Sequence, residues 1–199
     1  MSIFLTKYKM GKIFHLTSSL GLLRLLLFTT ALVKAAQEPR TGIIFRDRLK
    51  GRPLKKFGVH SIGPNHVYAV GQYGERTFLL QLSCNSSAKD ITSMLLKAVK
   101  VRCDSKDADK VEEFESLMLS SFPNGAPKGT SIFFSTVGRK LSMEINGKYV
   151  GTIDSNVLSK AFSDIYTGTN KVCIMRPVDN NVKCGSQNLD SMIGYLQNL

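Results

Sequence analysis

The sequence has no tryptophan, only three histidines and four cysteines, and 15 acidic residues against 27 lysines and arginines. No C-x-x-C pair occurs, and no pair of histidines stands near a cysteine, so the spacing predicts no zinc site. The sequence also lacks a G-x-S-x-G elbow and a phosphate-binding glycine loop. No serine hydrolase, metal enzyme or nucleotide-binding enzyme is therefore indicated, and we expect neither a metal nor a cofactor.

The shortage of acidic residues leaves a formal net charge of +12. The basic residues do not form a helix-turn-helix, a zinc finger or an aromatic stacking motif, so we expect no nucleic-acid partner. Much of the excess lies between Arg40 and Lys56. That segment is either a solvated edge that resists strand-to-strand aggregation, or a surface for an acidic ligand or an anionic membrane.

Residues 1–36 contain no Asp or Glu and carry three lysines near the start. The segment Leu20–Val33 is largely apolar, and small or modest residues follow it. This pattern predicts a signal peptide for the secretory pathway. A plastid or other organelle transit peptide, an uncut anchor and a start-site artefact remain as alternatives. The unbroken apolar run Leu25–Val33 is much shorter than the ~20 residues that span a bilayer.

The four cysteines all follow this leader, at Cys84, Cys103, Cys173 and Cys184. In an oxidising compartment they could form two disulfides with three possible connectivities, of which Cys173–Cys184 closes the shortest loop. Buried free thiols are the alternative. Asn85-Ser86-Ser87 is a glycosylation sequon, which matters only on the secretory route.

The stretch Leu54–Tyr73 predicts a hairpin of two polar-faced strands. Lys55–His60 and His66–Tyr73 are strand-like, and Ile62-Gly63-Pro64-Asn65 between them is a turn signal. The next run, Thr77–Cys84, is apolar on both faces, which is typical of a strand in the middle of a sheet. We therefore expect any polar site to lie in this hairpin, beside a central strand.

The rest of the chain alternates between helical and strand patterns. Helices are expected over Asp90–Val101, over Lys106–Ser120 and from Ser155 to Tyr166; strands are expected over Thr41–Phe45, Ser131–Val137, Leu141–Ile145 and Lys148–Ile153. A short terminal helix is expected within Leu189–Leu199. The order predicts one α+β domain, residues 40–176, with a tail at 177–199. Its antiparallel sheet would carry helices on one face and enclose a cleft between the two layers.

Five segments, in this order, resemble the chalcone isomerase superfamily. They are Gly58-Val59-His60-Ser61-Ile62-Gly63-Pro64, Val67-Tyr68-Ala69-Val70-Gly71-Gln72-Tyr73, Lys128-Gly129-Thr130-Ser131-Ile132-Phe133-Phe134, Ile145-Asn146-Gly147-Lys148 and Asn156–Gly168. The resemblance spans roughly residues 41–173. It implies an open-faced β-sandwich in which a ligand lies between the sheet and the helices.

The superfamily includes chalcone–flavanone isomerases and non-catalytic fatty-acid-binding relatives. The resemblance implies that two residues of the binding relatives hold the carboxylate of the fatty acid. One is an arginine before the Gly-Pro turn, and the other is a tyrosine in the next strand. Tyr68 matches that tyrosine, and the arginine position falls on His60. In the isomerases threonine is typical at the Tyr68 position, and the first long helix supplies a tyrosine and an asparagine. The helix expected at Asp90–Val101 has neither.

His66, Tyr68 and Val70 share one face of an ideal strand, so His66 is expected to add a second donor beside Tyr68. The candidate ligand-binding residues are therefore His60, His66 and Tyr68. We expect a monomeric, non-catalytic protein that binds a fatty acid or a similar amphipathic carboxylate. An isomerase of the intramolecular lyase type and a scaffold protein with a degenerate pocket are the alternatives, because histidine lacks the permanent charge that arginine offers an oxyanion.

Overall fold

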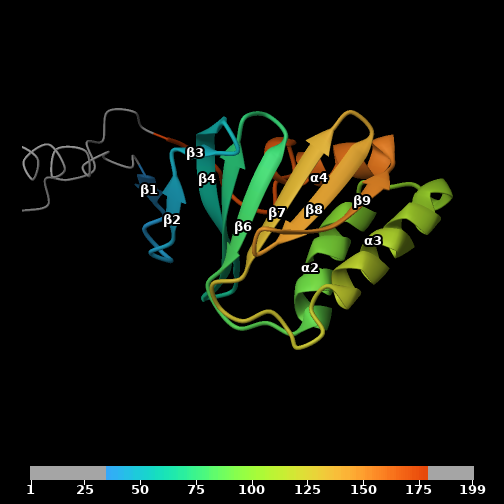
Figure 1. Cartoon of the computed structure of the whole chain (residues 1–199), viewed down its shortest axis with the longest axis horizontal. Helices are drawn as coiled ribbons and strands as arrows, with labels where there is room; N and C mark the ends of the chain where they lie inside the picture. The colour runs from blue at the N-terminus through green and yellow to red at the C-terminus, as the bar shows by residue number, and fades with distance from the viewer. Residues whose placement is uncertain (1–34, 179–199) are drawn as a thin grey trace, which may run out of the picture. The chain divides into compact units, whose positions relative to one another are not determined.

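The computed structural model describes residues 35–178, which form an antiparallel sheet with three helices packed on one face (Figure 1). The strands of the main sheet are β3 Arg48–Leu49, β4 Arg52–Ile62, β5 Asn65–Tyr73, β6 Thr77–Leu82, β7 Ser131–Val137, β8 Lys140–Ile145, β9 Lys148–Asp154 and β10 Arg176–Pro177. Their order is β10-β4-β5-β6-β7-β8-β9, with β3 paired to β4. The predicted α+β class is confirmed, and β6 lies in the middle of the sheet as expected.

Two hairpins follow from their turn residues. Gly63, with a φ of 58°, turns the chain between β4 and β5, and Asn146 and Gly147, with φ values of 50° and 79°, join β8 to β9. Positive φ at both central residues is the two-residue turn that matches strand twist, which is why Asn-Gly is favoured there. The hairpins expected from the sequence are therefore present.

Two of the three helices of the described residues begin at a serine that caps them, whereas the second along the chain has no side-chain cap. The three are α2 Ala88–Lys100, α3 Ala108–Ser120 and α4 Asn156–Thr167, and a 3-10 turn at Ser105–Asp107 precedes α3. The Ser87 hydroxyl accepts a hydrogen bond from the amide of Asp90, and the Ser155 hydroxyl accepts one from the amide of Leu158. Such side chains satisfy amide groups that have no partner within the helix. The three predicted helices agree with these bounds to within two residues.

The larger core lies between the sheet and the helices. Its centre is a group of aromatic side chains, all at most 1% exposed: Tyr68, Phe78, Phe114, Phe134, Phe162 and Tyr166. The ring centroids of Phe134 and Phe162 are 4.2 Å apart, and those of Phe78 and Tyr166 are 5.0 Å apart. These rings fill the space between the two layers.

A smaller core covers the other face of the sheet. Phe45, Leu54, Ala69 and Tyr73 are buried there, and the Tyr73 hydroxyl donates to the Arg46 carbonyl at 3.0 Å. Phe45 comes from β2, Ile44–Arg46, which pairs with β1, Ala35–Gln37. β1 thus lies upstream of residue 40, where the sequence led us to expect the domain to begin.

The first strand was expected at Thr41–Phe45, and this prediction is wrong in its first half. Residues 38–43 form a turn because the buried Glu38 carboxylate accepts hydrogen bonds from the amides of Arg40 and Thr41 and from the Thr41 hydroxyl. The strand therefore begins only at Ile44. The helix expected within Leu189–Leu199 lies outside the described residues.

Between residues 35 and 178, no helix is both long enough and apolar enough to cross a membrane. Cys84, Cys103 and Cys173 form no disulfide with one another. Cys184 lies outside the described residues, so the possible Cys173–Cys184 bridge has one of its two cysteines there.

Candidate functional site

The structure brings two of the three candidate residues together. His60 on β4 lies directly opposite Tyr68 on β5, and the two rings stack with centroids 5.0 Å apart and planes 20° apart. The Nδ1–H of His60 donates to the Val172 carbonyl oxygen at 3.1 Å. A donor at Nδ1 leaves Nε2 as the acceptor of a neutral ring. The pair is where the family resemblance places its ligand clamp.

The Tyr68 hydroxyl is already paired in the interior. It shares a hydrogen bond with the Tyr166 hydroxyl on α4 at 3.2 Å, and both rings are 1% exposed. Burial raises the pKa of both phenols well above the usual value, because a phenolate would lose its hydration there. Both groups are therefore neutral at physiological pH.

A segment after α4 closes this end of the interior. Residues 172–177, here named the strap, run along the edge of β4 and end in β10. Gly58 permits this approach, since a Cβ at that position would come within 2.5 Å of the Ile174 carbonyl oxygen. Cys173 of the strap is buried, and burial raises the pKa of its thiol to about 12. Tyr68, which stacks on His60 and bonds to Tyr166, is therefore only 1% exposed.

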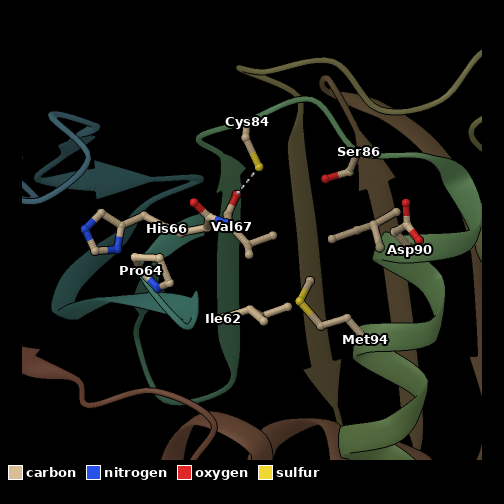
Figure 2. Close-up of a pocket in the computed structure, with 10 residues that line it drawn as sticks. Ile62, Pro64, His66, Val67, Cys84, Ser86, Asp90 and Met94 are labelled. Atoms are coloured by element: carbon tan, nitrogen blue, oxygen red, sulfur yellow. Dashed lines mark hydrogen bonds between the residues drawn. The ribbon is translucent and has the colours of Figure 1, made fainter.

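His66 does not stand beside Tyr68, although it does line the cleft described below. Ser61 pairs with His66 and His60 pairs with Tyr68, which leaves Val67 as an extra, bulged residue of β5. A bulge reverses the alternation of side chains along a strand. The His66 ring accordingly turns to Ser61, whose hydroxyl lies 2.8 Å from Nδ1, and away from the helices (Figure 2).

The same bulge helps to form a cleft that the sequence did not reveal. Val67 now points toward the helix layer, and Figure 2 shows it with Ile62 and Met94 around the space between the hairpin and α2. The cleft has a volume of about 500 Å³. Its lining residues are Ile62, Pro64, Asn65, His66, Val67, Cys84, Ser86, Asp90, Ile91 and Met94. Volumes of this order are typical of small-molecule sites.

The cleft combines an apolar wall with a polar rim. Ile91 and Met94 belong to the helical stripe that the sequence predicts as core. They lie in the first two turns of α2, and both also line the cleft. Asn65, Ser86 and Asp90 supply the polar groups. The Asp90 carboxylate accepts a hydrogen bond from the Ser87 hydroxyl at 2.6 Å, which fixes a negative charge at the rim.

A second, smaller hollow of about 250 Å³ lies where α2 gives way to α3, lined by Lys100, Cys103, Asp104, Ser105, Ala108, Val111 and Glu112. Burial is the main cause that raises the pKa of the Cys103 thiol, so the thiolate is disfavoured. Within the described part of the chain, no three His, Cys, Asp or Glu side chains gather into a metal-binding group.

The sheet order and the helices on one face agree with the open-faced arrangement that the sequence resemblance implied. A solved structure with this arrangement is a fatty-acid binding protein of Arabidopsis thaliana. The two structures superpose with a TM-score of 0.63 at 20% sequence identity, over 70% of this chain and 92% of the other. No protein-family model and no curated protein matches the sequence.

Proposed function

We propose that this chain is a non-catalytic binding protein that holds a fatty acid, or a similar amphipathic molecule, in the cleft between the β4–β5 hairpin and α2. The observation that carries the proposal is the cleft itself, which joins an apolar wall of Ile62, Val67 and Met94 to a polar rim. An acyl chain gains by leaving water for such a wall, and a head group needs the rim. The fold shared with a fatty-acid binding protein supports the same ligand class.

The binding site in this proposal differs from the one implied by the family resemblance. In this proposal Tyr68 and His60 do not hold the ligand carboxylate. The Tyr68 hydroxyl bonds to Tyr166, and His60 bonds to the strap. The head group would instead meet the Asn65 amide and the Ser86 hydroxyl at the rim. Asp90 at the rim opposes an ionised carboxylate, so we expect it to weaken the binding of a fatty acid without preventing it.

Two features favour binding over isomerase chemistry. Ring closure of a chalcone needs a fixed cation or donor network for the developing oxyanion. Among residues 35–178 the buried polar and charged side chains include no Lys or Arg. The Tyr68 hydroxyl, whose raised pKa keeps it protonated, already has its partner in Tyr166.

Titration of the purified full chain with hexadecanoic acid, followed by tryptophan fluorescence, tests the proposal in a Met94→Trp variant. The native chain has no tryptophan, so the new indole reports from the cleft alone. It should shift to the blue and saturate with hexadecanoic acid. A matched control, Leu119→Trp, places the indole at a half-exposed position on α3 and should not respond. An indole at position 94 that ignores the fatty acid and its methyl ester would contradict the proposal.

A second candidate, a scaffold protein without a ligand, is favoured by the filled interior. Tyr68 and Tyr166 are each only 1% exposed, and the Tyr68 hydroxyl, which the family resemblance expects to hold a ligand, bonds to Tyr166 instead. Native mass spectrometry separates the two candidates. A lipid-binding protein retains or takes up fatty acid, whereas a scaffold stays at the mass of its polypeptide when fatty acid is added.

A further inference from the structure

The edge of the sheet formed by β4 and the strap is strongly basic. Neither β4, residues 52–62, nor the segment 168–178 contains an Asp or Glu. Exposed cationic side chains from both segments stand along this edge: Lys55, Lys56, Lys171 and Arg176. Lys55 has a loose partner, the exposed Glu75 carboxylate at 3.6 Å.

An aliphatic side chain, Ile174, lies between two of these cations, Lys171 and Arg176, along the chain. Ile174 is 83% exposed, although its backbone carbonyl packs against Gly58. The geometry of the strap explains this exposure. Cys173 before it points into the interior, so Ile174 must point out, as successive residues of an extended segment do. Among the exposed large hydrophobic side chains of residues 35–178, Ile174 has the largest exposed fraction.

We propose that this basic edge, defined as Lys55, Lys56, Lys171, Ile174 and Arg176, docks on the surface of an anionic phospholipid membrane. The cations would meet the lipid phosphates and carboxylates, and Ile174 would enter the boundary between head groups and acyl chains. The charge of the edge is complementary to that surface. The inference goes beyond the proposed function, since it concerns a different face from the cleft.

The edge fits a membrane better than a nucleic acid or an acidic protein. A nucleic acid site of this size would use aromatic side chains to stack bases, and the aromatic residue on this part of β4, Phe57, packs on the smaller core. An acidic protein segment could pair with the free edge of β10. However, β10 offers only Arg176 and Pro177, and proline has no amide hydrogen for a further strand.

Sedimentation of the full chain with vesicles tests the proposal. Vesicles of phosphatidylcholine with phosphatidylserine should bind the chain, and pure phosphatidylcholine should bind it far less. Ile174→Glu should weaken binding to the anionic vesicles about tenfold or more, and each cation changed to glutamine about fivefold. Ile174 is exposed, so its replacement leaves the fold intact. Every variant keeps residues 1–34, so their five basic residues contribute equally to all measurements.

Val137→Glu is the matched control. Val137 is also an exposed aliphatic residue, at 61%, but it lies on β7, separated from β10 by β4, β5 and β6. At the spacing of neighbouring strands, β7 is about 19 Å from β10 and about 14 Å from β4. The same change of side chain there should alter vesicle binding by no more than about twofold.

Hydrogen–deuterium exchange then locates the contact. Anionic vesicles should slow exchange in residues 168–178 of the native chain, and Ile174→Glu should abolish that effect while exchange in residues 131–154 stays unchanged. Equal binding of the native chain and Ile174→Glu, with no slowing in residues 168–178, would overturn the proposal. Slowing of this segment by polyglutamate but not by vesicles would overturn it in favour of an acidic protein partner.

Discussion

Two neighbouring parts of the space between sheet and helices differ in how they are filled. We name the part around Tyr68 and Tyr166 the closed end, and the cleft around Val67 and Met94 the open end. Around Tyr68, the ring centroids of Phe78 and Tyr166 lie 5.0 Å apart, and the strap residues Val172, Cys173 and Met175 belong to or pack against the same core. Around Met94, the hairpin and α2 diverge and leave a cleft. A single fold thus holds a closed end where the family resemblance places a ligand clamp, and an open end where this chain has room for one.

The largest expected difference between the two ends is in stability. Phe162 is fully buried among Phe78, Phe114, Phe134 and Tyr166. Phe162→Ala should lower the free energy of unfolding by about 3–5 kcal/mol, because the cavity cannot collapse between two rigid layers. Met94→Ala at the open end should cost less than about 1.5 kcal/mol, since solvent already reaches that side chain. Urea unfolding of both variants measures the difference. Similar losses at the two positions would mean that the open end is packed as tightly as the closed one.

The tyrosine pair offers a sharper test of the closed end. Tyr68→Phe should destabilise the protein by about 1–3 kcal/mol, because it leaves the buried Tyr166 hydroxyl without a partner. The double variant Tyr68→Phe, Tyr166→Phe should recover part of that loss. Fatty-acid binding at the open end should be unchanged in both. If Tyr68→Phe instead abolishes fatty-acid binding and leaves stability unaltered, the ligand reaches the closed end.

The closed end should also make stability fall with rising pH. Burial raises the pKa of Cys173 in the folded state to about 12, above its value in an unfolded chain. The unfolded chain therefore releases the thiol proton first, and stability that is complete below about pH 9 is lost between about pH 9 and 12. Each such group contributes up to about 1.4 kcal/mol per pH unit in that window.

Urea unfolding at about pH 8 and pH 10 checks this effect. Cys173→Ala should lose a smaller part of its stability between the two values than the native chain does, and the tyrosines supply the remaining decrease. An identical decrease in the native chain and in Cys173→Ala would show that the thiol is not held in the interior.

The smallest expected effect concerns the rim of the open end. Asp90→Asn removes the negative charge beside a bound head group and should strengthen binding of ionised hexadecanoic acid up to about fivefold. The methyl ester carries no charge, and its binding should not change. Isothermal titration of both ligands with both proteins measures the contrast. Equal effects on acid and ester would place the head group away from Asp90.

The sequence predicts the secondary structure of this fold well where local chemistry determines it. Serine caps define the starts of α2 and α4, and Asn146-Gly147 defines a hairpin, because each depends on residues next to one another. Local pattern failed at the strand Ile44–Arg46, which was expected to begin at Thr41. The Thr41 amide donates to the Glu38 carboxylate, and this contact holds the residue in a turn instead of a strand. The two-residue strand β10 is held by β4 and has no pattern of its own.

The site was harder to predict, because it depends on contacts between distant segments. His60 and Tyr68 do lie together, as a hairpin requires. A single bulged residue, Val67, turned His66 to the other face, and alternation alone cannot show where a bulge falls. Tyr166, the partner of Tyr68, is 98 residues away in the chain. Tyr166 stands at the end of the apolar stripe of α4, so the sequence could predict that its side chain is buried. The sequence could not show that its hydroxyl bonds to Tyr68.

Methyl NMR on the methionines tests the central claim most directly, namely that a ligand binds at the open end while the interior stays closed. Met94 lines the cleft, whereas Met118 and Met143 are buried in the larger core. Addition of hexadecanoic acid to the labelled full chain should move the Met94 methyl signal and leave those of Met118 and Met143 in place. Shifts at Met118 and Met143, or no shift at Met94, would contradict the account.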